Sequence, residues 1–450
     1  MTQPDEDSRE VRQVRVPILT RVEGEGALNI ELQGNELRDV QLRIFEPPRL
    51  FEAFLQGRKM EEVPDFTARI CGICPIAYQV TAVQALEQAL GVTLPYELES
   101  LRRLIYYGEW IESHVLHMHL LHAPDFFGCA SGIELAQKYP EEVKRGLRMK
   151  KHGNRLLEVL GGRAIHPINV AVGGFYRLPS KEDLQSLIPD FEWALEAAKA
   201  TAEWILSLEY PDFDVPYQFV ALSHPDEYAI HQGDVRISDG TWMESHQYEH
   251  HFEEVQVPHS NAYHSLRKLG GSTYFVGPLA RVLLNGRMLS PSARKLLEYF
   301  PMQGPRYNPQ WSIYARALEV VHAFESSLQI LKTYVPYKVP RLEYRVCESE
   351  GTSCTEAPRG LIYHRYRIDE DGRIQFAKIV PPTSQNQAQI ESDLRALIPR
   401  LLEANATQKA STDSQHWLTG LCEHLIRSYD PCISCSTHFL RIHVRQFGHE

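Results

Sequence analysis

Two Cys-x-x-Cys pairs stand near opposite ends of this 450-residue chain. Cys71 and Cys74 lie in Arg69-Ile-Cys-Gly-Ile-Cys-Pro75, and Cys432 and Cys435 lie in Asp430-Pro-Cys-Ile-Ser-Cys-Ser-Thr-His438. Residues three apart in a tight turn or a first helical turn can aim two sulfurs at one point. Four thiolates would suit zinc, iron–sulfur or nickel. We therefore expect a soft metal site that takes two ligands from each end of the chain.

The separation of the two pairs along the sequence argues against a zinc ribbon. Zinc ribbons usually hold their cysteine pairs about 15–20 residues apart within one small module. Spacing alone leaves structural zinc, coincidence and a catalytic metal centre all open. The residues that flank the cysteines are needed to distinguish these three possibilities.

The elements that position these residues can be read from the apolar pattern. Alternating residues over 28–32 and 40–44 predict one β-hairpin, and 361–368 with 374–380 predict a second, just after Arg359. Apolar residues at helical spacing predict helices over 77–90, 101–115, 183–208, 313–331, 389–404 and 416–428. The last helix should stop before Asp430-Pro431, because proline disfavours a helical conformation in the preceding residue. We expect an α+β, mainly helical fold, with a large helical core and small antiparallel sheets.

Composition limits the partners and the compartment. Lys and Arg number 47 against 58 Asp and Glu, so the formal charge of −11 disfavours nucleic acid and anionic membranes. No apolar run approaches the roughly 20 residues of a membrane span, and the polar N-terminus lacks a signal-peptide core. We expect a cytoplasmic protein. Cys129, Cys347, Cys354 and Cys422 are too scattered to suggest an iron–sulfur cluster.

The residues around both cysteine pairs resemble the signatures of nickel–iron hydrogenase large subunits. Segments 21–26, 51–57, 161–167, 356–360 and 381–384 also look like motifs of that family, in its order. The resemblance spans nearly the whole chain and looks closest to the soluble, cytoplasmic, bidirectional branch linked to NAD(P), which includes sulfhydrogenase alpha subunits. It implies the hydrogenase large-subunit fold, as a single domain over residues 1–450.

The resemblance assigns the four cysteines to a nickel–iron centre. It implies that Cys74 and Cys435 bridge nickel to iron, and that Cys71 and Cys432 bind nickel terminally. The iron would carry cyanide and carbon monoxide as non-protein ligands. This assignment follows from the family, because nothing in the sequence itself shows the diatomic ligands.

Two further pairs of residues match binding positions of the family. Thr383 would offer a hydroxyl or backbone amide to a cyanide nitrogen, and Pro382 would pack beside it. Without the motif, residues 381–384 read as an ordinary loop. Glu52 and His438 match the ligands of a structural magnesium or iron(II) ion near the carboxy terminus, although histidine is a less usual ligand for magnesium.

Heterolytic cleavage of dihydrogen needs a hydride acceptor, which metals supply, and a base for the proton. A thiolate such as Cys432 is the nearest base, and Glu23 fits the next step, because a carboxylic acid can relay a proton where a guanidinium cannot. Arg359 matches the arginine that, in this family, lies next to the vacant coordination position of the metal centre. Asp125 and Asp430 match the two aspartates expected near it, since a buried guanidinium needs carboxylate partners. A plain structural salt-bridge cluster is the alternative reading of this set.

Several histidines receive no ligand role. His114, His117, His119 and His122 cluster beside Asp125, and His250 and His251 form a pair, but satisfied or exposed histidines are commoner than ligands. By resemblance, His166 lines the contact with a partner subunit. Many relatives carry histidine at the positions of Glu25 and Tyr78, so hydrogen bonding around the bridging Cys74 is expected to differ here.

The resemblance also implies partners and processing. A small subunit with iron–sulfur clusters, and diaphorase subunits with flavin and iron–sulfur clusters, would carry electrons between dihydrogen and NAD(P). Nickel-insertion chaperones and a maturation endopeptidase would act on the precursor, and residues 439–450 would be the extension removed after His438. The alternatives are a hydrogen-sensing regulatory subunit and a non-catalytic four-cysteine zinc scaffold.

Overall fold

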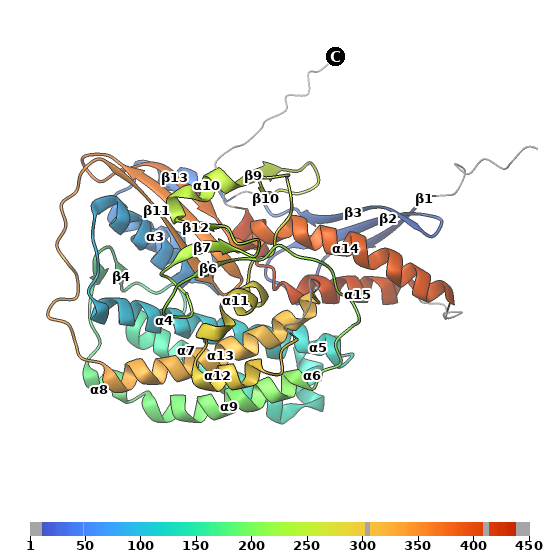
Figure 1. Cartoon of the computed structure of the whole chain (residues 1–450), viewed down its shortest axis with the longest axis horizontal. Coiled ribbons are helices and arrows are strands. Elements are labelled where there is room, and N and C mark those ends of the chain that lie inside the picture. The colour runs from blue at the N-terminus through green and yellow to red at the C-terminus, as the bar shows by residue number, and fades with distance from the viewer. Residues whose placement is uncertain (1–10, 48, 302–306, 408–413, 438–450) are drawn as a thin grey trace, which may run out of the picture.

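The computed structural model describes residues 11–47, 49–301, 307–407 and 414–437. Long helices pack together in one half of the molecule (Figure 1). They are α4 (Tyr96–Leu116), α7 (Pro140–Gly161), α9 (Ile188–Leu206) and α13 (Ser312–Thr333). Helix α4 contacts α7 and α13, and α13 also contacts α9. The helix predicted over 183–208 is divided into α8 (Lys181–Gln185) and α9, and Pro189 occupies the first turn of α9.

Helix α4 leads directly into a wider π-helical turn. This turn, η3 (His117–His122), is followed by the short α5 (Ala123–Phe126). Pro124 at the start of α5 lacks an N–H, and the regular α-helical hydrogen-bond pattern is not continued across the junction. The π-turn therefore carries three of the four clustered histidines, His117, His119 and His122, and ends beside the helix that holds Asp125.

A three-stranded antiparallel sheet lies in the other half of the molecule (Figure 1). Its order is β11 (Ser349–Ala357), β12 (Gly360–Ile368) and β13 (Ile374–Val380), so the hairpin predicted after Arg359 is confirmed. Helix α3 (Pro75–Leu90) packs on β11 and β12. This packing joins the helix that follows the first cysteine pair to the strand that follows Arg359.

A second antiparallel sheet is built from the N-terminal segment. Its strands are β1 (Val11–Val16), β2 (Gly26–Gln33) and β3 (Glu36–Ile44). Val14 pairs with Ile30, and Ile30 pairs with Val40, so the buried apolar residues share one face. The predicted hairpin is confirmed, and β1 is an additional strand.

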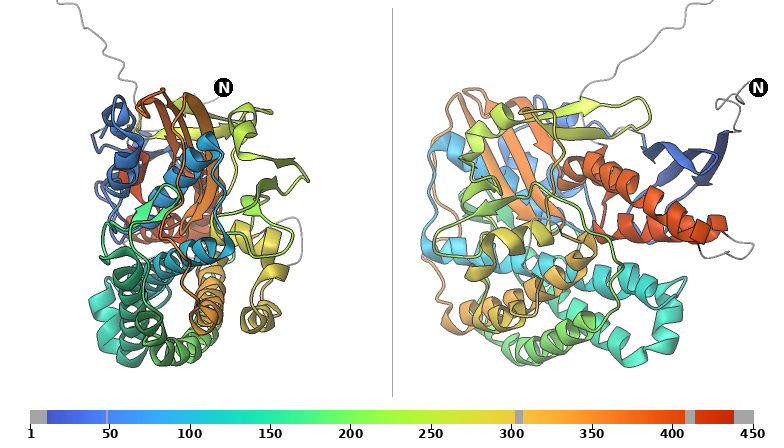
Figure 2. Two further views of the ribbon diagram at one scale, coloured as in Figure 1. Left: turned by 90° about the vertical axis from the view of Figure 1, so that its left-hand side faces the viewer. Right: turned by 45° about the vertical axis from the view of Figure 1, so that its right-hand side comes forward.

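Two C-terminal helices lie beside this sheet (Figure 2). Helix α14 (Pro382–Thr407) packs on β3, β10 (Tyr263–Arg267) and α15 (Ser414–Ser428). Helix α14 begins earlier than predicted, because proline is well suited to a first helical position. Residues 382–384 are therefore the start of a helix and not an ordinary loop, and Pro381 directly precedes it. Helix α15 ends before Asp430-Pro431, as predicted.

The remaining elements are short and connect these layers. They are α1 (Phe51–Leu55), η2 (Met60–Glu62), α2 (Val63–Ala68), α6 (Gly132–Lys138), β4 (Val170–Ala171), β5 (Gly174–Phe175), β6 (Val220–Ser223), β7 (Asp234–Ile237), β8 (Trp242–Met243), η4 (Ser245–Gln247), α10 (Tyr248–His251), β9 (Phe252–Gln256), α11 (Pro278–Asn285), η5 (Gly286–Met288), α12 (Pro291–Leu297), η6 (Pro309–Trp311) and η7 (Ile433–Ser436). The predicted fold class, α+β and mainly helical with small antiparallel sheets, is confirmed. Within the described part of the chain, none of the helices combines the length and apolarity needed to traverse a bilayer.

Candidate metal centre

The first cysteine pair lies in the turn between α2 and α3. The Sγ atom of Cys71 accepts hydrogen bonds from the backbone N–H groups of Ile73 and Cys74, each at 3.3 Å. Pro75 then occupies the first position of α3. Two of the N–H groups in that first helical turn, those of Ile76 and Ala77, donate to the buried carboxylate of Glu109, at 2.5 and 3.0 Å. The turn that carries Cys71 and Cys74 is therefore fixed at its helical end.

The second cysteine pair lies in the turn that follows α15. Asp430 has a positive φ of 54°, which reverses the chain before Pro431. The N–H of Cys432 donates to Thr383 Oγ1 at 3.1 Å, and the N–H of Ile433 donates to the carbonyl of Glu23 at 2.9 Å. The turn is thus held between the first turn of α14 and the segment that precedes β2.

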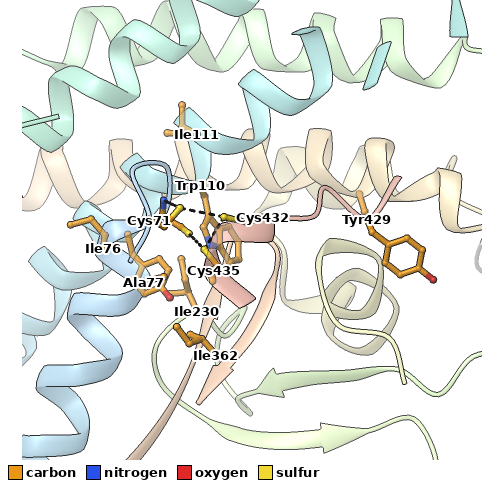
Figure 3. Close-up of a cluster of buried hydrophobic side chains, with 14 of the residues drawn as sticks. Cys71, Ile76, Ala77, Trp110, Ile111, Ile230, Ile362, Tyr429, Cys432 and Cys435 are labelled. Atoms are coloured by element: carbon orange, nitrogen blue, oxygen red, sulfur yellow. Dashed lines mark hydrogen bonds between the residues drawn. The ribbon is translucent and has the colours of Figure 1, made fainter. Parts of the chain in front are cut away.

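The two turns bring the four sulfurs together. The Sγ–Sγ distances are 3.5 Å for Cys71 and Cys432, 3.8 Å for Cys74 and Cys435, and 2.7 Å for Cys432 and Cys435. All four Sγ atoms lie within 4.8 Å of one another, and each cysteine is at most 3% exposed. Figure 3 shows Cys71, Cys432 and Cys435 pointing toward one another among buried side chains that include Trp110, Ile230 and Ile362. The sulfurs that the sequence predicted as ligands therefore meet at one buried point.

The chemistry of these donors fits a soft metal. Burial, and then the neighbouring thiols, raise the pKa of Cys432 well above its ordinary value. Hydrogen bonds from Cys432, Cys435 and Cys74 lower the pKa of Cys71. A cation among the sulfurs would favour the thiolate form of all four, because metal coordination deprotonates a thiol. Four buried sulfurs at these separations are a suitable donor set for nickel and iron.

Glu23 is in direct contact with this centre. Its Oε2 atom lies 2.9 Å from Cys432 Sγ and accepts the N–H of Ser434 at 3.1 Å. Gly24, with a φ of +85°, allows this close approach, because a Cβ there would lie 2.8 Å from Cβ of Ile433 and 2.9 Å from N of Ser434. Glu23 itself is half-buried. Its carboxylate therefore lies between the buried thiol of Cys432 and more exposed residues.

Arg359 is buried beside the cysteines and pairs with one of its two expected partners. Its Nε donates to the carbonyl of Asp430 at 2.8 Å, and its Nη2 donates to Asp430 Oδ1 at 3.2 Å. Burial alone would lower the pKa of Arg359, but the charges of Asp430, Cys432, Cys74 and Cys71 raise it above its usual value. Nη1 of Arg359 is buried and has no hydrogen-bond partner among the described residues. This orphaned donor fits a centre that would carry acceptor ligands.

The expected contact between Asp125 and Arg359 is wrong. Asp125 binds Arg21, with its closest contact at 2.6 Å, and Arg427, whose Nε donates at 2.7 Å. Both carboxylate oxygens of Asp125 are occupied by these two guanidinium groups. Among the described residues, Asp430 alone forms an ion pair with Arg359. Asp125 instead connects the segment before Glu23 to the last turn of α15.

The other predicted binding residues are only partly brought to this centre. Thr383 is buried against Cys432. Pro382 is the first residue of α14, the helix that also carries Thr383. Glu52 is buried on α1, where its Oε1 accepts the N–H of Ile379 at 2.8 Å. His438 and the segment 439–450 lie outside the described residues, so the pairing of Glu52 with His438 stays a prediction.

The histidines of the π-turn bind neighbouring protein groups. His117 Nε2 lies 2.7 Å from the carbonyl of Arg427, His119 Nδ1 lies 3.0 Å from that of Val115, and His122 Nε2 lies 3.0 Å from Gln310 Oε1. His114 lies one turn earlier, on α4, and its Nε2 is 2.9 Å from the buried carboxylate of Glu319. His122 also lies with Asp125 and His424 in a group whose ligand atoms are within 4.8 Å of one another, so the absence of a ligand role for these histidines stays a prediction.

The two positions where this chain departs from the family differ in location. Tyr78 is buried, and burial, then the charges of Cys435 and Cys74, raise its pKa. Its ring lies 5.8 Å from that of His364 on β12. The side chain of Glu25 is exposed, and its backbone N–H donates to Glu46 Oε1 at 2.7 Å. Only Tyr78 therefore adjoins the sulfurs.

Sequence reasoning missed several residues that build this region. Arg427 and Arg21 hold Asp125, Glu109 accepts from the start of α3, and Glu46 accepts from Ser434 Oγ at 3.0 Å. Arg21 stands in the Arg-Val-Glu-Gly motif and could have been chosen from it. The others carry no local signal, because their partners lie far away in the sequence.

Comparison with known proteins agrees with this geometry. A family model described as nickel-dependent hydrogenase matches residues 49–145 and 236–438. The chain is 35% identical to Sulfhydrogenase 1 subunit alpha and 36% identical to Sulfhydrogenase 2 subunit alpha of Pyrococcus furiosus, covering 95% and 94% of this chain and 98% of each relative.

The fold is likewise similar to that of a solved hydrogenase. The crystal structure of an NAD+-reducing [NiFe]-hydrogenase in the H2-reduced state superposes with a TM-score of 0.82 at 25% identity, covering 95% of this chain and 99% of the other. The resemblance drawn from the motifs is therefore confirmed over nearly the whole length. The chain belongs to the nickel-dependent hydrogenase family and is a large subunit of a nickel–iron hydrogenase.

Proposed function

We propose that this chain catalyses the reversible heterolytic oxidation of dihydrogen and passes the electrons to a small subunit with iron–sulfur clusters. The observation that carries the proposal is the convergence of four buried sulfurs from both ends of the chain, with a carboxylate 2.9 Å from one of them. When bound, a nickel–iron centre supplies the acceptor for the electron pair of dihydrogen. The residues around it then have to accept, hold and move the proton.

Cys432 and Glu23 are the first two proton carriers in the proposed route. The sulfur of Cys432 holds the proton, and Glu23 Oε2 receives it across 2.9 Å without any movement of the backbone. The N–H of Ser434 binds the same oxygen and fixes its position. Because Glu23 is half-buried while Cys432 is fully buried, the transfer leads outward.

Arg359 and Thr383 are proposed to bind the non-protein ligands of the centre. The buried guanidinium of Arg359 places a positive charge beside the thiolates, and its Nη1 can donate to a ligand on the iron. Thr383 Oγ1 accepts from Cys432, so its own hydroxyl proton can be donated to a cyanide nitrogen. Asp430 holds Arg359 through two hydrogen bonds and serves as a positioning residue.

The electron partners are proposed from the relatives and from one surface feature. Beyond the two cysteine pairs, the remaining cysteines are isolated in sequence, so electrons need a second subunit to leave. His166 Nδ1 lies 2.9 Å from the carbonyl of Ala68, close in sequence to Cys71, and Ile165 and Ile168 beside it are exposed. We assign this surface to the small subunit. The NAD+-reducing structural relative favours diaphorase subunits serving NAD(P).

Infrared spectroscopy of the natively purified, nickel-supplied complex tests this function. Bands from metal-bound cyanide and carbon monoxide, together with dihydrogen-dependent dye reduction, are the expected result. Their absence would favour a zinc scaffold, and bands without turnover would favour a hydrogen sensor. Cys432→Ser should lose both nickel and turnover, whereas Cys422→Ser, a buried cysteine outside the cluster, should retain both.

A further inference from the structure

A second group of metal-binding side chains lies away from the four cysteines. His259 precedes β10, His264 is on β10, and Glu391 is on α14. One ligand atom from each of the three lies within 4.8 Å of the others. The group sits where the hairpin of β9 and β10 packs on α14, a contact that Figure 1 shows near β3. Donor atoms from the hairpin and from α14 therefore lie close to one point, which is the arrangement that a metal site needs.

The buried ring of His264 is suited to bind a cation. His264 is 4% exposed, and its ring centroid lies 5.6 Å from that of His259. The Nε2 atom of His264 is buried and has no hydrogen-bond partner among the described residues. An unpaired buried nitrogen costs free energy, which coordination would offset.

The carboxylate of Glu391 is already oriented toward the histidines. Its Oε1 atom accepts the backbone N–H of Leu42 at 2.9 Å and lies 2.8 Å from Nε2 of His259. Glu391 Oε2 lies 3.4 Å from Arg395, which also pairs with Asp39 at 3.6 Å. Asp39 offsets the charge of Arg395, and one negative charge remains for a divalent ion.

We propose that His259, His264 and Glu391 bind a first-row divalent metal ion, with Zn²⁺ as the expected ion. Two imidazole nitrogens and one carboxylate oxygen are a common zinc donor set and disfavour magnesium or calcium, which prefer oxygen ligands. The side chain of His259 is 19% exposed, so a water molecule can reach a fourth position. The ion would fasten the β9–β10 hairpin to α14, the helix whose first turn holds Thr383 against Cys432.

Metal analysis of the intact complex tests the site. We expect the wild-type complex to hold one more equivalent of zinc than His264→Gln, with the nickel content equal in both. His250→Gln, an exposed histidine on α10, is the matched control and should retain the zinc. An equal zinc and iron content in the wild type and in His264→Gln would overturn the proposal. Loss of an equivalent of iron in place of zinc would support the site with Fe²⁺ as its ion.

A second variant distinguishes loss of the metal ion from misfolding of the protein. His259 is less buried than His264, so His259→Gln disturbs the packing less and should also lose the metal. Replacement of the ion by Co²⁺ gives a further readout, because cobalt bound to two imidazoles and a carboxylate has visible ligand-field bands. We expect these bands in the wild type and not in His259→Gln. Identical spectra in the two proteins would contradict the assignment.

Discussion

The Sγ atom of Cys432 lies 2.9 Å from Oε2 of Glu23, although the two residues stand at opposite ends of the chain. Their backbones also meet, through a bridge between the two residues and a hydrogen bond from Ile433 N–H to the carbonyl of Glu23. A backbone contact fixes the separation of these side chains more firmly than a side-chain contact alone. The thiol and the carboxylate therefore form a preorganised pair.

Glu23→Gln tests the proton transfer directly. Glutamine keeps the size and an acceptor oxygen, so the sulfurs and the N–H of Ser434 can remain in place, but an amide cannot relay a proton at neutral pH. We expect turnover to fall by about 100-fold or more, the usual scale for loss of a positioned proton carrier. Nickel content should not change. Rates of dihydrogen–deuterium exchange and of dye reduction measure the loss.

The matched control for this variant is Glu25→Gln. The side chain of Glu25 is exposed, and its contact with this region is through the backbone N–H. Its turnover should stay within about twofold of the wild type, since a surface carboxylate plays no part in positioned proton transfer. Equal activity of Glu23→Gln and Glu25→Gln would exclude Glu23 from the proton route.

Gly24→Ala tests whether close packing sets the position of Glu23. A Cβ at Gly24 would lie 2.8 Å from Ile433 Cβ and 2.9 Å from Ser434 N, and it would also contact the Glu46 carboxylate. Gly57 also has a positive φ, +77°, but a Cβ there meets nothing within 4 Å. Gly57→Ala should lose only the roughly 1–2 kcal/mol of a left-handed alanine and retain its turnover. Gly24→Ala should lose more stability and most of its turnover, measured by thermal unfolding and dye reduction; the idea fails if both variants behave alike.

Arg359→Lys separates charge from geometry. Lysine keeps the positive charge but cannot donate to both the carbonyl and the carboxylate of Asp430 as the guanidinium does. Loss of one hydrogen bond to a charged group costs about 1.5–3 kcal/mol, so turnover should fall by about 10- to 100-fold. The change should appear in kcat, with nickel retained. Arg365→Lys, on the partly exposed part of β12, should retain full turnover, and an equally active Arg359→Lys would show that charge alone suffices.

Local sequence signals predicted some elements and could not predict others. The hairpin of β2 and β3 was predictable, because the apolar residues of each strand alternate and a turn lies between the strands. Strand β11 was not, because its sequence has no apolar alternation and its burial comes from packing on α3, where Gly351 approaches the backbone of Ala85. Tertiary contact here overrides the local pattern.

The same distinction holds for the metal centre. The four cysteines could be selected from residue type and spacing, because few chemistries use Cys-x-x-Cys at both ends of a chain. The partners of Asp125 could not be selected in this way, since the π-turn before α5 determines which guanidinium groups Asp125 meets. Ligand identity is therefore readable from sequence, while the surrounding ion pairs depend on how distant elements pack.

Asp393 gives a prediction for the pH dependence of stability. Its Oδ2 atom accepts hydrogen bonds from Tyr217 at 2.7 Å and Tyr429 at 2.6 Å, and Tyr429 directly precedes Asp430. Burial raises the pKa of Asp393 to about 6, against the hydrogen bonds from these tyrosines and Gln389, which lower it. The folded state therefore binds this proton more tightly than the unfolded state, whose pKa is about 4. Stability should fall as pH rises from about 4 to about 6, by roughly 2–3 kcal/mol.

Asp393→Asn removes this ionisation and keeps an oxygen for the two tyrosines. The unfolding midpoint of the variant should therefore rise relative to the wild type between pH 4.5 and pH 7.5, because only the wild type has to ionise a buried carboxyl. Scanning calorimetry at matched heating rates measures the difference. Asp226→Asn, at an exposed position, should follow the wild-type curve throughout. Parallel curves for Asp393→Asn and the wild type would mean that Asp393 has the same proton affinity in the folded and unfolded states, and would contradict the raised pKa.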